Sequence, residues 1–267
     1  MPAESKLLAE FPFEVRSGLL WVQVNVPRSV EPLNFVLDSG ASASVINLRT
    51  AKRLGLKLGR RVDVRGVGSA TEGFWPQQLT AKAGEVALPR EYLALDLAEL
   101  SRACDCGVDG LLGADFFQGR VVQLDFGERK IRLLRSSEVT GNAGVVDLKV
   151  SRGVMLAAVG VNRGRPQWLR VDTGCASALQ WVAGAGKGTS AKGTVSVGLT
   201  ALNIPTTTTT VTLGEMVFDA VPTGLHQRPI FSGESGLLGN GLLSRFERVT
   251  IDTKAGRLVL ENCRKDS

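Results

Sequence analysis

The chain has 267 residues and a mass of 28.4 kDa, which is enough for one large domain or two modest ones. Hydrophobic residues make up 43% and charged residues 22%, so the composition excludes a disordered or fibrous protein. The net charge of +6 is scattered, and no apolar run approaches the roughly 20 residues that span a bilayer. We therefore expect a soluble globular protein that binds no nucleic acid and has no integral membrane segment.

The scarcity of histidine and the cysteine spacing exclude several kinds of site. His226 is the only histidine, so a multi-histidine metal site is excluded, and no G-x-S-x-G motif of a serine hydrolase is present. Cys104 and Cys106 are too close in sequence to form an unstrained disulfide, and Cys175 and Cys263 stand alone. The sequence predicts free thiols, as in a reducing compartment, and argues against a structural zinc site.

The N-terminal residues show no basic-then-apolar signal pattern. We expect a cytoplasmic protein if Met1 is the native start, and a periplasmic or secreted one if a signal segment was removed.

In chain order, the first half consists of short predicted strands with two short helices. An apolar strand at 19–26 leads to the segment FVLDSGA at 35–41. Helical patterns follow at 48–54, which Gly55 ends, and at 97–102. The block GLLGADFF at 110–117 begins a short turn at its alanine, and a hairpin with strands at 121–126 and 130–134 follows.

The second half repeats this order. A strand at 154–161 precedes WLRVDTGC at 168–175, a threonine run at 206–210 predicts a strand, and GLLGNGLL at 236–243 precedes a second hairpin. The aspartates of the two D-[ST]-G triplets are 134 residues apart (172 − 38). A duplicated, mostly β unit of about 130 residues is therefore predicted, with an N-terminal lobe at 1–138 and a C-terminal lobe at 139–267.

The repeated triplet predicts a pair of catalytic carboxyls. If the two units pack about a pseudo-twofold axis, Asp38 faces Asp172, and two carboxyls in contact share one proton. One then acts as the general base on a water molecule, while the protonated partner donates a hydrogen bond to the carbonyl under attack.

The other residues of the triplets suit loops that brace one another. Ser39 and Thr173 supply hydroxyls that can bind the opposite loop, and Gly40 and Gly174 allow close backbone approach. The Leu-Leu-Gly segments would supply an apolar floor for each loop.

These motifs together resemble the pepsin/retropepsin-like aspartic peptidases, in a single-chain bilobal form with two retropepsin-sized lobes. The resemblance covers most of 12–134 and 145–261. It implies an all-β acid-protease fold with two pseudo-twofold-related β-barrel lobes. It also implies endopeptidase activity on an extended peptide or unfolded protein bound between the lobes, without metal or organic cofactor. Because one chain carries both aspartates, we expect a monomer.

The family covers its site with a mobile β-hairpin flap, which the resemblance assigns here to 64–75. Its expected tip and substrate-binding residues are Gly66, Val67, Gly68, Ser69 and Trp75. The only tyrosine, Tyr92, lies outside this stretch, so Trp75 is considered in place of the flap tyrosine of pepsin. The glycine-rich stretch at 184–199 of the second lobe is a less clear hairpin.

Other polar residues have simpler interpretations. Asp125 and Asp252 lie in the predicted hairpins and are expected to serve turns, and Asp109 is expected to make a local loop hydrogen bond. The segment 184–190 superficially resembles a phosphate-binding loop, but no Ser or Thr follows its lysine, so a loop is favoured. His226 is expected in an exposed loop.

Cys175 has two interpretations. It fills space as a small buried side chain, which is favoured, or it makes the dyad sensitive to oxidation and thiol reagents. Cys104 and Cys106 are expected to be unbridged loop thiols, with a redox or metal role as the alternative.

Two alternatives to an active peptidase stay open at this stage. One is a catalytically silent module that binds peptides or proteins between the same lobes. The other is a structural scaffold in which the duplication has no catalytic purpose.

Overall fold

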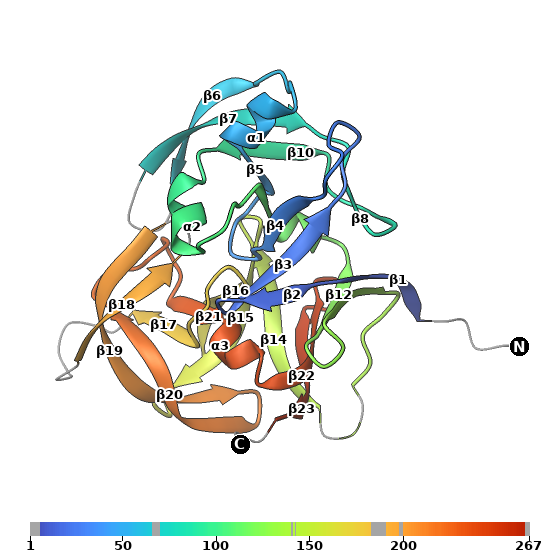
Figure 1. Cartoon of the computed structure of the whole chain (residues 1–267). Helices are drawn as coiled ribbons and strands as arrows, with labels where there is room; N and C mark the ends of the chain where they lie inside the picture. Colours follow the sequence, from blue (N-terminus) through green and yellow to red (C-terminus); the bar gives the residue numbers. More distant parts are fainter. Residues whose placement is uncertain are drawn as a thin grey trace, which may run out of the picture.

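The computed structural model describes residues 6–65, 70–139, 141, 143–182, 191–197 and 200–264, and only the backbone of residues 65, 70, 191–197 and 200–203. Strands dominate and the helices are short, which confirms the all-β prediction (Figure 1). The elements are β1 (Leu7–Pro12), β2 (Glu14–Arg16), β3 (Leu19–Val24), β4 (Leu33–Leu37), β5 (Val45–Asn47), α1 (Leu48–Arg53), β6 (Arg60–Arg65), β7 (Ala70–Gln78), β8 (Lys82–Ala83), β9 (Val86–Ala87), β10 (Glu91–Leu95), α2 (Ala98–Ala103), β11 (Gly110–Leu112), the 3-10 helix η1 (Ala114–Phe116), β12 (Val121–Asp125), β13 (Lys130–Leu134), β14 (Gly144–Ser151), β15 (Val154–Val161), β16 (Gln167–Asp172), β17 (Leu179–Val182), β18 (Ala191–Val197), β19 (Thr200–Leu213), β20 (Met216–His226), β21 (Gly236–Gly239), α3 (Asn240–Leu243), β22 (Phe246–Asp252) and β23 (Arg257–Cys263).

The two halves of the chain build sheets with the same strand order. In the first half the order is β2-β3-β4-β11-β5-β10-β7-β6. In the second half the order β15-β16-β21-β17-β20-β19-β18 repeats it from β3 onward. In each half the strand before an aspartate pairs in parallel with the Leu-Leu-Gly strand, as β4 does with β11 and β16 with β21. The repeat in the sequence is therefore a repeat of topology.

The second half closes on itself, because β15 pairs with β19 as well as with β16. Six strands from β15 round to β19 thus form a ring. Within the described part of the first half, the eight-stranded sheet has no such closing pair. The barrel expected for both lobes is therefore seen as a closed ring in one of them.

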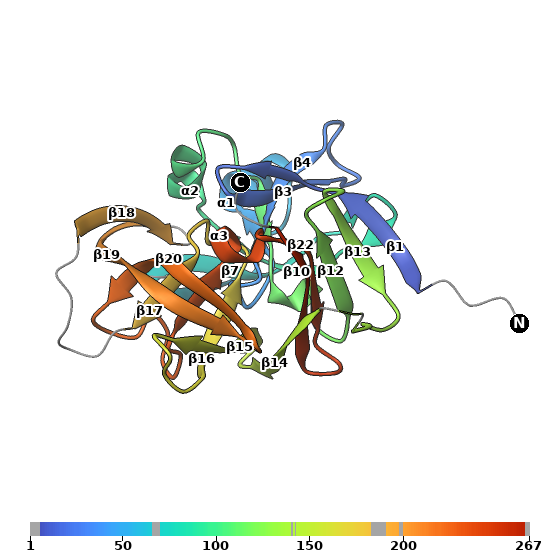
Figure 2. The same cartoon turned by 90° about the horizontal axis from the view of Figure 1, so that it is seen from below.

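A shared sheet joins the two halves. The hairpin β12–β13 of the first half pairs with the hairpin β22–β23 of the second through antiparallel β12 and β22, with Val121 opposite Asp252. The N-terminal strand β1 adds to β13, and β14 adds to β23. The strands of this sheet that are labelled in both views, β1, β12, β14 and β22, lie near one another in each of them (Figures 1 and 2).

Alternating side chains on the central strands separate two apolar clusters. Phe35 and Leu37 of β4 point into the large core, which extends through both halves. Val36 points to the opposite face of the sheet, where it packs with Trp21 and Leu111. Ala176 of the second half packs against this second cluster. By the same alternation Asp38 lies on the Val36 face, toward the other half.

Candidate active site

Strand pairing positions each aspartate at the end of a strand in the interior of its sheet. Asp38 follows β4, and its N–H donates to the carbonyl of Leu112 on β11 at 2.9 Å. Asp172 is the last residue of β16 and lies opposite Gly239 of β21. The parallel pairing explains the spacing in the sequence, because each Leu-Leu-Gly strand supports the strand that ends in an aspartate.

The serine and threonine next to these aspartates bind the opposite loop reciprocally. The Ser39 hydroxyl donates to the Val171 carbonyl at 2.7 Å, and the Thr173 hydroxyl donates to the Leu37 carbonyl at 2.8 Å. In return, the Ser39 N–H donates to the Thr173 hydroxyl oxygen at 2.9 Å, and the Thr173 N–H donates to the Ser39 oxygen at 3.0 Å. Both side chains are fully buried, so these bonds hold the two loops together without competition from water.

The glycines after these residues lie directly against the opposite carboxyl. A Cβ atom on Gly40 would lie 2.4 Å from Cγ of Asp172, and one on Gly174 would lie 2.5 Å from Cγ of Asp38. No other amino acid fits at either position without moving a carboxyl. The two contacts are symmetric, and they bring each aspartate against the other's loop.

The two carboxyls are nearly buried and interact with each other. Asp38 is 9% exposed and Asp172 6% exposed. Burial raises the pKa of both carboxyls, and the charge of Asp38 raises the pKa of Asp172 further, to well above the ordinary range.

Their hydrogen bonds are unequal. The Oδ1 atom of Asp38 accepts from the N–H groups of Gly40 at 3.1 Å and Ala41 at 3.0 Å, whereas among the backbone donors of the described residues Asp172 accepts from Gly174, at 2.9 Å. Backbone donors stabilise the ionised form, so Asp172 is the better holder of a shared proton.

Comparison with protein families finds a match in the first half of the chain. Residues 22–116 match the family model described as aspartyl protease, a segment that runs from within β3 to the end of η1 and includes Asp38 and the first Leu-Leu-Gly strand. For residues 22–116 the match supports an aspartic peptidase of the pepsin/retropepsin type. The match supports a protease function in general terms. A search of curated proteins finds no match to the chain.

The matched segment contains the hairpin that the sequence predicts as a flap. Strands β6 and β7 pair antiparallel from Arg60 opposite Trp75 to Arg65 opposite Ala70. The predicted tip residues Gly66, Val67, Gly68 and Ser69 lie outside the described part of the chain. Trp75 lies at the base of the hairpin, at the opposite end from the tip. Its place in the register therefore does not favour Trp75 as a replacement for a flap-tip aromatic residue.

A half-buried carboxylate, that of Asp115, braces the Asp38 loop from behind. Asp115 accepts hydrogen bonds from the Ser44 N–H at 2.9 Å and from the Ser44 hydroxyl at 2.7 Å. The Gly113 N–H in turn donates to the Ser44 oxygen at 3.0 Å, and Ala114 donates to the Ala41 carbonyl at 2.7 Å. Asp115 lies within the GLLGAD motif, and only its position there could have indicated this role.

The second half has no carboxylate at this place, because Gly241 aligns with Asp115, and it instead uses an asparagine one position earlier, where the first half has Ala114. Asn240, which is 2% exposed, donates from Nδ2 to the Thr173 carbonyl at 2.7 Å and to the Gly18 carbonyl at 3.0 Å. It thus ties the second aspartate loop to the first half of the chain. The sequence signal was the change from Ala114 to Asn240 after otherwise identical Gly-Leu-Leu-Gly blocks.

Arg170 is the most important residue near the site that sequence reasoning missed. It lies on β16 two residues before Asp172, is 7% exposed, and forms an ion pair with Glu234. An arginine within the apolar run of a central strand is the signal that could have indicated it, because an arginine there must find a buried partner.

Cys175 is buried and His226 is half-buried, and a chain of hydrogen bonds connects them. The Cys175 sulfur lies 3.0 Å from the Ser177 hydroxyl, to which the Gln180 amide donates at 2.7 Å. Oε1 of Gln180 lies 2.7 Å from Nε2 of His226. Burial lowers the pKa of His226 and raises that of Cys175 to about 12.

The expectation of an exposed loop for His226 is wrong. This residue ends the long strand β20 and lies opposite Val182 of β17. For Cys175, burial and the raised pKa favour the packing interpretation over a reactive thiol.

The expected turn roles of Asp125 and Asp252 are consistent with their contacts. Asp125 accepts from the Glu128 N–H at 2.7 Å, and Asp252 accepts from the N–H groups of Lys254 and Ala255 at 3.0 and 2.8 Å. Asp109 is different, because it accepts from the Asn34 N–H and the Thr50 hydroxyl, both far from it in sequence. Its bonds are long-range, so the prediction of a purely local role is wrong.

Other features of the described residues do not indicate a second site. Within these ranges no cluster of three or more His, Cys, Asp or Glu side chains could hold a metal ion, and no helix is long and apolar enough to cross a membrane. All four cysteines are free.

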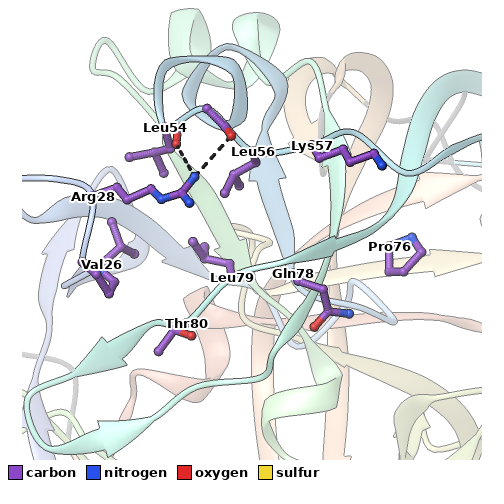
Figure 3. Close-up of a pocket in the computed structure, with 11 residues that line it drawn as sticks. Val26, Arg28, Leu54, Leu56, Lys57, Pro76, Gln78, Leu79 and Thr80 are labelled. Carbon is purple, nitrogen blue, oxygen red and sulfur yellow. Dashed lines mark hydrogen bonds between the residues drawn. The ribbon is translucent and has the colours of Figure 1, made fainter.

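A cavity of about 490 Å³ opens beside Arg28, but neither Asp38 nor Asp172 lines it (Figure 3). There the Arg28 guanidinium donates to the carbonyls of Leu54 and Gly55 at the end of α1, at 3.3 and 3.2 Å. Arg28 thus serves the end of a helix, since the last carbonyls of a helix lack partners within it.

Proposed function

We propose that this protein is an aspartic endopeptidase in which Asp38 and Asp172 are the catalytic pair. Asp38 is the general base and Asp172 carries the shared proton. Peptides and unfolded proteins are its substrates. Both carboxyls come from one chain, so a monomer suffices for the chemistry.

The unequal hydrogen bonding supports these roles. Asp38 accepts two backbone N–H bonds and Asp172 one, and the pKa of Asp172 is raised further than that of Asp38 by burial and by the neighbouring carboxylate. When the pair holds one proton, we therefore assign the proton to Asp172 and the negative charge to Asp38.

The reaction then proceeds by general acid–base chemistry. The Asp38 carboxylate takes a proton from a water molecule as the water oxygen bonds to the peptide carbonyl carbon. Asp172 gives its proton to the carbonyl oxygen, which leaves a neutral tetrahedral diol. When the C–N bond breaks, the amide nitrogen takes a proton from Asp38. One hydroxyl proton of the diol returns to Asp172, and an acid and an amine are released.

The reciprocal hydrogen bonds and close contacts between the two aspartate loops are the observation on which this proposal depends. Ser39 and Thr173 each donate to and accept from the opposite loop, and Gly40 and Gly174 admit the opposite carboxyl at close range. A duplicated protein that had lost the chemistry would not need to keep two carboxyls buried against each other, because paired buried carboxyls are costly.

The test measures cleavage of a denatured protein and of peptides blocked at both ends, from about pH 3 to 8. Internal fragments identified by mass spectrometry indicate an endopeptidase. The variants Asp38→Asn and Asp172→Asn each remove one of the proposed groups with little change in shape. Asp147→Asn is the matched control, since Asp147 is exposed on β14.

Cleavage by the wild type and the control, lost in both dyad variants, supports the proposal. Peptide binding without cleavage by the wild type would overturn it in favour of a silent binding module. If the wild type neither binds nor cleaves peptides, the proposal is overturned in favour of a structural scaffold. An equimolar mixture of the two dyad variants should stay inactive, because neither chain then carries a complete pair. Restored activity would mean that two chains share the site.

A further inference from the structure

Arg170 makes a dense set of contacts beside the dyad. Its Nε donates to Glu234 at 2.7 Å and its Nη2 donates to the other carboxylate oxygen at 2.5 Å, so the ion pair is bidentate. The guanidinium lies 3.5 Å from the ring centroid of Phe231. Both charged side chains are only 9% exposed. Pairs of this geometry are among the strongest in proteins.

The remaining nitrogen of Arg170 reaches the opposite aspartate loop. Nη1 donates to the carbonyl oxygen of Gly40 at 2.6 Å. The N–H of the same glycine donates to Asp38, and its Cα packs against the carboxyl of Asp172. One side chain of the second half therefore holds the residue that touches both carboxyls.

The first half has no counterpart to this arginine. Arg170 lies opposite Leu237 in its strand pair, as Val36 lies opposite Leu111 in the other. Val36 is 1% exposed and packs in an apolar cluster. An apolar residue thus satisfies the fold at this position. At the equivalent position in the second half, the buried Arg170–Glu234 pair carries a desolvation free-energy cost that an apolar pair would avoid. This cost points to a role beyond folding.

We propose that Arg170 is a positioning residue of the active site. Together with Glu234 it fixes the Gly40 carbonyl, and with it the Asp38 loop, and its positive charge helps one carboxyl of the dyad to stay ionised. The inference rests on the proposed peptidase function for its kinetic consequences, although the electrostatic part does not need activity.

The direction of the effect follows from the charged groups of the described residues that face the dyad. Among the described residues, Arg170 on β16 and the buried thiol of Cys175 interact electrostatically with the carboxyls, and Glu234 before β21 pairs with Arg170. Burial raises the pKa of both aspartates, and the charge of Arg170 opposes that rise in each. Loss of the arginine charge should move the pH–rate profile to higher pH, and loss of the glutamate charge should move it to lower pH.

Two variants and one control test the proposal by pH–rate profiles. Arg170→Gln combined with Glu234→Gln removes both charges and leaves a neutral polar pair, whereas Glu234→Gln alone leaves the arginine charge unopposed. Arg132→Gln breaks another largely buried pair, with Asp125, in the shared sheet. We expect the profile of the double variant to move up in pH, that of Glu234→Gln to move down, and that of the control to keep its position.

The kinetic constants provide a second readout. Because Arg170 is buried and holds a loop, we expect the double variant to lose about tenfold or more in kcat with little change in KM. Profiles of the double variant and of Glu234→Gln that coincide with that of the wild type would overturn the proposal.

A titration of the aspartate carboxyls by ¹³C NMR, with Asp38→Asn and Asp172→Asn for assignment, separates this proposal from the proposed function. If no form cleaves peptides but the dyad titrates at higher pH in the double variant, the peptidase proposal fails and the role of Arg170 stands. If the wild type cleaves and neither variant changes the titration, the role of Arg170 fails alone.

Discussion

The Thr173 hydroxyl offers the sharpest test of how the two halves are held together. Thr173→Val keeps the shape of the side chain but removes the donor to the Leu37 carbonyl and the acceptor for the Ser39 N–H. Both partners are buried, so water cannot replace the lost bonds. We therefore expect two unsatisfied backbone groups in the core of the interface.

The expected cost follows from these two groups. A buried polar group left without a partner costs about 1–3 kcal/mol, so the free energy of unfolding should fall by about 2–6 kcal/mol. That is a large part of the roughly 5–15 kcal/mol that stabilises a typical domain. Thr173→Ser keeps the hydroxyl and loses one methyl group, so we expect it to cost only about 1 kcal/mol. Serine already fills the equivalent place in the first half, at Ser39.

Urea unfolding followed by tryptophan fluorescence measures these differences, since the chain has four tryptophans. Thr208→Val is the matched control, because Thr208 is exposed on β19 and its substitution should change stability by less than about 0.5 kcal/mol. The reasoning is refuted if Thr173→Val is no more destabilising than Thr173→Ser, because the hydroxyl would then contribute nothing at the interface.

Three further predictions concern pH and thiol chemistry. Burial and the neighbouring carboxylate raise the pKa of Asp172, so the stability that its bound proton provides is lost as pH rises through that pKa. Asp172→Asn should therefore unfold at a higher urea concentration than the wild type at pH 7, but not near pH 3. Equal urea midpoints at pH 7 would contradict this prediction. Burial raises the pKa of Cys175 to about 12, so iodoacetamide at pH 8 should modify exposed Cys263 and spare Cys175 until urea is added. Mass spectrometry measures the modification of each cysteine. Equal modification rates of Cys175 and Cys263 in the native protein would contradict this prediction. Burial opposes ionisation of Asp252, but hydrogen bonds from the Ser137 hydroxyl and the turn N–H groups lower its pKa. Ser137→Ala should therefore lower the free energy of unfolding by about 1–2 kcal/mol at pH 7, and by less as pH falls through the pKa of Asp252. An unchanged cost at pH 2 would argue against a stabilising hydrogen bond from Ser137 to the Asp252 carboxylate.

The repeat made much of the fold predictable. Strands before each D-[ST]-G triplet, hairpins after each Leu-Leu-Gly block and the short helices at 48–54 and 97–102 all correspond to observed elements. These features depend on local patterns, such as apolar runs, turn residues and glycine, which a single sequence displays directly. The proximity of Asp38 and Asp172 followed from symmetry, because two copies of one unit that pack about an axis must bring equivalent loops together.

The residues that the sequence did not reveal are those whose role depends on a distant partner. In the sequence Arg170 only interrupts the apolar pattern of a strand. Its role becomes visible when the fold places Glu234 and the Gly40 carbonyl around it, from 64 and 130 residues away. His226 was expected in an exposed loop, because nothing nearby shows that β20 continues to it and pairs with β17. Trp75 was considered as a flap residue, but the register of the hairpin decides which end a residue occupies.

The sequence alone thus determined the repeated unit, its β character and the two acidic loops, since each is encoded in a few neighbouring residues. Only the tertiary structure decided which aspartate receives more backbone donors, which position carries a buried charge and how β12 and β22 join the halves. Hydrogen bonds and ion pairs between distant segments set these properties, and their strength depends on the burial that the complete fold creates.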